Sequence, residues 1–388
     1  DTVARGLAAR LTKADVQALQ LHPSVPSPRY RGARTLWGPP RPRHARSVDQ
    51  HDAQGATTLG AFHDNIVDAD GHFDDRETTV AHAFAEPHAA LGGERYGARL
   101  CGALHREGLM RAGLRIVEVG PGTGELARDF WAAAATEQLP ADYLRIDRSP
   151  GLLDAQALRC PESRGLRGDA CALPLSDESV DLLLNNEVIA DLSAVLWDGH
   201  ERSALHTEVA QRVARYGLEV LPGAGPYNLG AWQLLEEIGR VLVPGGGAFI
   251  TEFGAVDELP QETTHLDHPE VSIHFGHLMA VARGLGLSAR LVPLHVLLQA
   301  DLGARWLGRP GHAALRALHH AAGQRLAARA WTAASAPTPE VVQGLRDVAI
   351  VEDGPGPVIT RFPALLIGKP SPASLSPARS DRRGPASA

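Results

Sequence analysis

Glycines and carboxylates gather at the ends of short apolar runs in the middle of this 388-residue chain. The run at 114–119 contains Glu118 and leads into Gly120, Gly122 and Gly124, after which a helical pattern begins. Glycines permit positive φ and let a ligand approach the main chain, and the following helix offers unpaired N–H groups. We therefore expect a ligand to pack against this turn.

The spacing of the loop separates the ligand classes that such a turn could hold. A dinucleotide loop needs Gly or Ala at position 125, where this chain has Glu125, whose charge would oppose a pyrophosphate. No Gly-Lys-Ser/Thr follows, which argues against a P-loop. A nicotinamide dehydrogenase is therefore a distant alternative.

The pattern Glu-x-Gly-x-Gly-x-Gly resembles motif I of class I S-adenosylmethionine (SAM) methyltransferases, and the resemblance covers about residues 114–254. It implies that the loop, including Pro121 and Thr123, holds the amino-acid end of a phosphate-free cofactor. Asp147, followed by Arg148, ends the second apolar run, where a carboxylate can accept both ribose hydroxyls. Asp169 and Ala170 resemble the adenine-side loop of the family. Taken singly, each Asp equally suits a solvated turn, and the order of all three motifs favours the resemblance.

The segment after the run at 180–186 narrows the resemblance. Its sequence, Asn-Asn-Glu-Val-Ile-Ala-Asp-Leu, resembles the Asn-Glu-x-x-Asp-Ala-Leu-Pro segment of the MidA-like methyltransferases, which are implicated in respiratory complex I assembly through arginine methylation. The sequence departs from that pattern, because Asp191 lies one place late and no Pro follows Leu192. The N-terminal third matches faintly, and 298–356 matches nothing in the family.

The resemblance suggests a chemical role for Glu187, which follows Asn186. A guanidinium is too basic to lose its proton easily, so a carboxylate must pair with it and orient one nitrogen. We assign Glu187 to catalysis and substrate binding, with Asp191 at i+4 as a second candidate and Asn186 on the cofactor side. The alternative is that Glu187 is a helix-start carboxylate beside an Asn cap, and that Asp191 is solvated.

Four histidines form two His-x-x-His pairs, at 265/268 and at 274/277. Imidazole and carboxylate ligands suit zinc or a non-haem metal, but pairs outside an established helix are more often loop residues. We therefore expect no metal. His274 lies in a family-like segment and is a candidate for shaping the substrate pocket.

The elements that position these residues alternate short β-rich runs, at 114–119, 143–147, 180–186 and 248–253, with helical stretches. This alternation predicts an α/β fold with a parallel sheet covered on both faces. By resemblance we expect a doubly wound, mostly parallel, seven-stranded Rossmann-like sheet. The expected organisation is a basic Pro/Arg-rich irregular arm (1–58), a helical addition (59–113), the SAM-binding core (114–297), a helical insertion (298–356), the last strand (357–370) and a disordered tail (371–388).

The composition of the chain restricts the kinds of partner and the cellular location that we expect. The net charge of −7 argues against nucleic acid, although residues 1–47 carry nine Arg or Lys against two Asp. No apolar run is long enough to span a membrane. Three scattered cysteines suit a reducing compartment, so we expect a cytoplasmic protein, or one of the mitochondrial matrix if eukaryotic. An Arg-containing start suits a transit peptide or a solvated tail equally.

The sequence thus predicts a SAM-dependent methyltransferase that acts on a protein arginine, with a homodimer as one expected assembly. Two rivals stay open. One is a methyltransferase for a small-molecule acceptor, enclosed by the N-terminal region and the insertion. The other is a non-catalytic SAM-binding assembly or scaffold protein.

Overall fold

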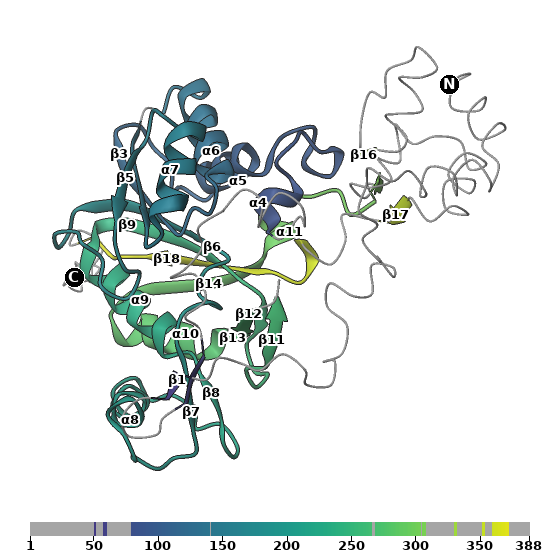
Figure 1. The fold of residues 1–388 in the computed structure, drawn as a ribbon. Coiled ribbons are helices and arrows are strands. Elements are labelled where there is room, and N and C mark those ends of the chain that lie inside the picture. The colour runs from purple at the N-terminus through teal and green to yellow at the C-terminus, as the bar shows by residue number, and fades with distance from the viewer. Residues whose placement is uncertain are drawn as a thin grey trace, which may run out of the picture.

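The computed structural model describes residues 50–51, 57–59, 79–139, 141–265, 268–303, 305–307, 330–331, 351–353 and 359–371. Its centre is a seven-stranded sheet with the order β14-β18-β9-β6-β3-β4-β5 (Figure 1). The strands are β3 (Leu114–Val119), β4 (Ala141–Asp147), β5 (Arg164–Arg167), β6 (Val180–Asn186), β9 (Leu242–Thr251), β14 (Ser288–Pro293) and β18 (Pro363–Gly368). Neighbouring strands from β5 to β9 pair in parallel, and β18 runs antiparallel to both β9 and β14. The predicted fold class is confirmed.

Helices cover both faces of this sheet. The longer ones are α5 (Tyr96–Arg106), α6 (Glu125–Thr136), α7 (Pro150–Arg159), α8 (Ala204–Tyr216), α9 (Leu229–Val241) and α10 (Phe275–Gly284). Three are single turns: α4 (Val80–Ala83), η2 (Ala89–Leu91) and α11 (Leu294–Leu297). Figure 1 shows α5 and α6 on one side of the sheet and α9 and α10 on the other.

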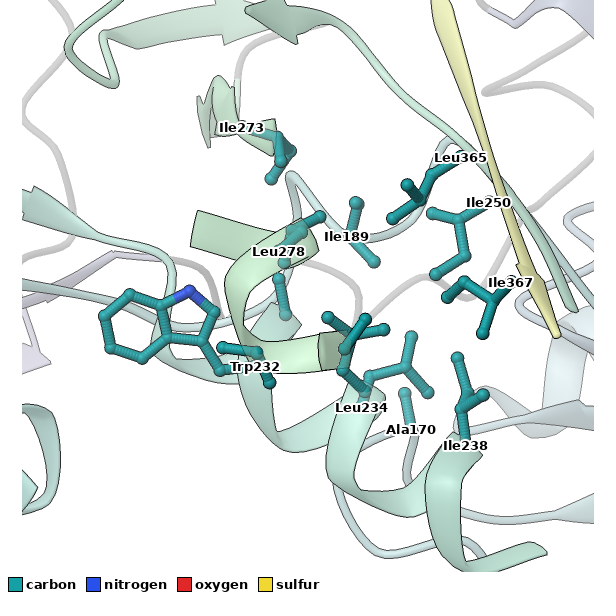
Figure 2. Packing of buried hydrophobic residues seen from close by; sticks show 14 of the residues in the cluster. Ala170, Ile189, Trp232, Leu234, Ile238, Ile250, Ile273, Leu278, Leu365 and Ile367 are labelled. Carbon is teal, nitrogen blue, oxygen red and sulfur yellow. The ribbon is translucent and has the colours of Figure 1, made fainter. Parts of the chain in front are cut away.

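Strand β6 explains why the predicted runs are continuously apolar. Its Leu182 and Leu184 pack in the core formed with α5 and α6, whereas Leu183 packs in the core formed with α9 and α10. Strands buried on both faces lose the alternation of half-exposed strands. Figure 2 shows the second core, where Ile250 and Ile367 of the sheet lie across from α9.

Smaller sheets surround the main one. A four-stranded sheet contains β1 (Gln50–His51), β2 (Thr57–Leu59), β7 (Ala194–Trp197) and β8 (Gly225–Tyr227). Two short pairs join β10 (Gly254–Ala255) to β13 (Ile273–His274) and β11 (Glu262–His265) to β12 (His268–Val271). The expected helical insertion contains β15 (Arg305–Leu307), β16 (Ala330–Trp331) and β17 (Val351–Asp353). The other residues of 304–356 lie outside the described ranges, as does the predicted tail beyond 371.

Three local expectations need correction. Strand β9 starts at Leu242, directly after α9, and not at 248 as predicted, because it continues through Pro244 and the glycines that follow. Its pairing with β6 shifts register between Val180 and Leu182, which accommodates the extra residues. The last strand begins at Pro363 and not near 358, because a proline at the first position of a strand need not donate to the ladder.

The alternative interpretation of Glu187 as a helix-start carboxylate is also wrong, as is the helical i+4 relation of Asp191 to it. The residues after β6 form turns, and the N–H of Asp191 donates to the carbonyl of Val188 at 3.0 Å. Asp191 therefore does not share a helix face with Glu187. Within the described part of the chain, every helix is too short or too polar to cross a bilayer.

Candidate active site

The glycine loop follows β3 at the carboxyl edge of the parallel strands, where ligands of open α/β sheets bind. Gly120, Gly122 and Gly124 have φ values of 68°, 55° and 93°, a region that strains other residues. A Cβ at Gly120 would lie 2.5 Å from Val188 Cγ2, whereas a Cβ at Gly122 would meet nothing within 4 Å. The loop is thus tightly packed at Gly120 and open at Gly122, as an approaching ligand requires.

Gln156 of α7 connects the loop to Asp147. Its Nε2 donates to the carbonyl oxygen of Gly122 at 2.8 Å and to Asp147 Oδ2 at 2.9 Å. The other Asp147 oxygen accepts the backbone N–H of Ser149 at 2.9 Å. Asp147 is therefore held at the end of β4 beside the loop, where its strand was predicted to end, whereas no sequence pattern marked Gln156.

The predicted loop residue Thr123 lies in a buried polar cluster. Its hydroxyl donates to Glu125 and lies 3.2 Å from His82 Nε2 of α4. Glu125 also forms an ion pair with Arg159, whose guanidinium donates to the Thr123 carbonyl at 3.1 Å. The charge of Glu125 at the start of α6 is thus paired with Arg159. Through His82, α4 contacts the glycine loop directly.

The adenine-side candidates lie at the end of the next strand. Asp169 Oδ1 accepts the N–H of Cys171 at 2.8 Å, and Arg148 Nε lies 3.9 Å from Asp169 Oδ2. The Asp169 side chain is 45% exposed, so it remains accessible to a ligand. Ala170 is buried in the core beneath α9, where Figure 2 shows it close to Leu234.

Glu118, the acid of the glycine motif, is buried within β3. Its Oε2 accepts the hydroxyl of Tyr143 at 2.9 Å. Burial raises the pKa of Glu118 to about 8, while Tyr143 and Arg145 oppose the rise. This raised pKa favours the protonated form of Glu118 at neutral pH, which the sequence did not indicate.

Asn186 and Glu187 lie at the carboxyl end of β6. Glu187 Oε1 accepts the N–H of Val80 at 2.7 Å and the Asn186 amide at 3.0 Å. The hydroxyl of Tyr96 donates to Asn186 Oδ1 at 2.6 Å. Glu187 itself has a φ of 56°, and its N–H donates to the Thr251 carbonyl at 2.9 Å. The candidate catalytic carboxylate is therefore tied to α4, α5 and β9.

Glu187, Asp191 and Glu270 all act electrostatically on a further acid, Glu252. Glu252 follows β9, is 2% exposed, and accepts the N–H groups of Ala190 and of Phe253. Burial raises the pKa of Glu252 well above its usual value, and the charges of Glu270, Glu187 and Asp191 raise it further. The sequence missed Glu252 and Glu270, although the position of Glu252 after a parallel strand could have marked it.

His274 serves the structure of α10. Its Nδ1 accepts the N–H of His277 at 3.1 Å, and the two rings stack with centroids 4.0 Å apart. Burial, followed by the charge of His274, lowers the pKa of His277 to about 4. Among the residues that the structure describes, no group of three or more His, Cys, Asp or Glu side chains is arranged to hold a metal ion.

Comparison with known families bears on this edge of the sheet. A family model described as a methyltransferase domain matches residues 117–217, which run from β3 through the glycine loop, Asp147, Asp169 and Glu187. The chain contains a SAM-dependent methyltransferase domain. SAM is accordingly the cofactor of this methyltransferase, and the open main chain at Gly122 fits its approach. A search of curated proteins found no significant match.

Solved structures resemble this methyltransferase at low identity. An uncharacterised protein from Burkholderia thailandensis is 16% identical, with a TM-score of 0.46, over 81% of this chain and 88% of that one. A TehB-like SAM-dependent methyltransferase from Corynebacterium glutamicum is 20% identical, with a TM-score of 0.31, over 54% and 83%. Phosphoethanolamine N-methyltransferase 2 of Haemonchus contortus is 14% identical, with a TM-score of 0.39, over 79% of this chain and 61% of that one. The chain therefore spans less than two thirds of that protein.

Proposed function

We propose that this methyltransferase transfers a methyl group to the guanidinium of a protein arginine. The carrying observation is the group of acids whose charges act on Glu252 after β9: Glu270 in β12, and Glu187 and Asp191 after β6. Because these charges oppose the ionisation of Glu252, a cation bound among them would relieve the repulsion. The likeness to the MidA-like family in the Asn186-Glu187 segment supports the same acceptor.

The chemical step asks the protein mainly for alignment. Bound SAM supplies a methyl group activated by a sulfonium. We assign Glu187 to pairing with the guanidinium, which would orient one nitrogen toward the methyl group and keep the positive charge on the other two. With SAM held at the glycine loop, Glu187 would aim that nitrogen at the methyl group. The neutral thioether of S-adenosylhomocysteine would leave, and the proton released by the methylated nitrogen would pass through the Glu187 carboxylate to water.

We expect Glu187→Gln to lower kcat for arginine methylation at least tenfold and to leave the Kd for SAM within about twofold. The amide keeps the size of the side chain but cannot neutralise a guanidinium. Single-turnover transfer from labelled SAM to an arginine-containing peptide library, read by mass spectrometry, measures the rate, and calorimetry measures SAM binding. Asp142→Asn is the matched control, since Asp142 lies at the opposite end of β4 and pairs with the exposed Arg164.

Equal turnover by Glu187→Gln would contradict the assignment of Glu187. Labelled cell extract decides between acceptors. Label in protein arginine supports the proposal, and label in a small molecule favours the rival acceptor. SAM binding without any labelled product favours a scaffold.

A further inference from the structure

We propose that Tyr96 is a positioning residue for methyl transfer, which acts by fixing the Asn186 amide so that its N–H group supports the Glu187 carboxylate. The inference rests on the proposed role of Glu187. The contacts form a continuous series: Tyr96 donates to Asn186 Oδ1 at 2.6 Å, and Asn186 Nδ2 donates to Glu187 Oε1 at 3.0 Å.

Packing makes Tyr96 a rigid donor. Its side chain is 1% exposed and lies in the core that α5 and α6 form on the sheet. Burial, together with the charge of Glu187, raises the pKa of Tyr96 well above its usual value, so the hydroxyl keeps its proton. The ring therefore presents a fixed O–H group to Asn186.

The orientation of the Asn186 amide determines what Glu187 meets. The two ends of an amide differ, since the oxygen only accepts and the nitrogen only donates hydrogen bonds. While Tyr96 donates to Oδ1, the nitrogen must face Glu187. Without the hydroxyl, the amide can rotate and place its oxygen against the carboxylate, which would remove a donor and add a repulsive dipole.

This donor matters because the surroundings are acidic. Glu187 acts electrostatically on Tyr96 in α5 and on Glu252 after β9, and His82 in α4 lies two residues beyond Val80. Glu118 in β3 also acts on Tyr96, and Glu270 in β12 and Asp191 also act on Glu252. A hydrogen bond donated to a carboxylate favours its charged form. By holding the amide, Tyr96 helps Glu187 to stay ionised and aligned among other acids.

A stability cycle tests the connection without a substrate. The unfolding temperatures of the full chain, Tyr96→Phe, Glu187→Gln and the double variant are compared at pH 4.5 and 7.5. An N–H group donates a stronger hydrogen bond to a charged carboxylate than to a neutral carboxyl group, so we expect the Tyr96→Phe deficit to be larger at pH 7.5. In the Glu187→Gln background this extra deficit should vanish.

Tyr216→Phe is the matched control. Tyr216 also donates to a carboxylate, Glu236 Oε1 at 2.7 Å, but on α8 and α9 away from the glycine loop. Its pH-dependent deficit should persist in the Glu187→Gln background. A Tyr96→Phe deficit that is equal at both pH values, or that Glu187→Gln leaves unchanged, would overturn the inference.

Turnover gives the second readout, with an arginine-containing peptide as the probe. We expect Tyr96→Phe to lower kcat about tenfold, with KM and the SAM Kd within twofold, and to move the acid limb of the pH profile upward. Tyr216→Phe should change none of these. A normal kcat and pH profile in Tyr96→Phe would refute the inference. If Glu187→Gln is fully active, the catalytic role assigned to Glu187 fails separately, and the stability cycle still decides whether Tyr96 and Glu187 are linked.

Discussion

Glu187 and Gly122 both have positive φ at the carboxyl edge of the sheet, at 56° and 55°. For glycine this conformation costs little, but for glutamate it is strained. Such strain persists only where the surroundings hold it, and here the bonds from Val80 and Asn186 hold the side chain while Thr251 accepts its N–H. The conformation places the carboxylate at α4 instead of continuing β6.

We expect Gly122→Val to raise the SAM Kd at least a hundredfold, because the new side chain would enter the open space that the ligand needs. Gly113→Val is the control. Gly113 also has a positive φ, 76°, and open space around a built Cβ, but it precedes β3 at the far edge of the sheet. Calorimetry should show normal SAM binding only in the control, with similar losses of unfolding temperature in both. Tight binding by Gly122→Val would remove the loop from the site.

The raised pKa of Glu118 predicts that the stability of the fold depends on pH. Its pKa is raised from 4.5 to about 8, first by burial, so between these values the folded state keeps a proton that the unfolded state has lost. Stability from this group therefore falls as pH rises, by at most about 1.4 kcal/mol per pH unit, and levels off above pH 8. Glu118→Gln should gain stability relative to the wild type between pH 5 and 8 in denaturant titrations. A constant difference would contradict the raised pKa.

At the scale of elements, α4 joins the two halves of the site. Its first N–H, from Val80, binds Glu187, and its His82 lies against Thr123 of the glycine loop. A helix of four residues has little stability of its own, so these contacts and its cap must hold it. One short helix thus contacts both the glycine loop and Glu187, the residue that we propose to bind the acceptor.

Loosening α4 should speed SAM dissociation. Thr79 caps α4 by accepting the His82 N–H at 3.1 Å, and its replacement by Ala should cost about 1 kcal/mol locally. We expect stopped-flow measurements to show a several-fold faster release of SAM from Thr79→Ala. Ser203→Ala removes an equivalent cap, 3.2 Å from the His206 N–H, at the start of α8 and should leave release unchanged. Equal release rates in both variants would exclude the coupling.

Features of the fold and site that depend on neighbouring residues were predictable from the sequence, whereas those that depend on contacts between distant residues were not. The strands β3, β4 and β6 are local apolar runs, and the glycine loop from Gly120 to Gly124 is recognisable from its residue types and their spacing. The strands and the loop were therefore predictable from the sequence. The contacts of Glu187 were not, since Val80 lies 107 residues away. Nor was the turn after β6, where bonds to distant strands override the local preference for a helix.

At the scale of the whole molecule, β18 lies between β14 and β9 in the main sheet and runs antiparallel to both. Lys369 follows this strand, and its ammonium group donates to the carbonyls of Leu242 at 2.8 Å and of Gly239 at 3.0 Å. Its main chain exchanges hydrogen bonds with Gly245 and Gly246, both at 2.8 Å. One residue thus fastens the last strand to the end of α9 and the start of β9.

We expect Lys369→Met to lower the free energy of unfolding by about 1–2 kcal/mol, because carbonyls at a helix C-terminus lose a charged donor while the methylenes stay packed. Urea denaturation measures the loss, and SAM affinity should not change. Arg164→Met removes an exposed pair with Asp142 and should change stability by less than about 0.5 kcal/mol. Equally small effects in both variants would show that the hydrogen bonds of the Lys369 ammonium group contribute nothing to stability.

The same residue has a practical consequence. Lys369 and Lys13 are the only lysines in the sequence, so amine-reactive reagents meet two lysine side chains in this chain. Because the Lys369 ammonium is bound to two carbonyl groups, it should acylate only when the end of β18 separates from α9. The rate of acylation at Lys369, followed by peptide mapping, would report directly on how often the end of β18 separates from α9.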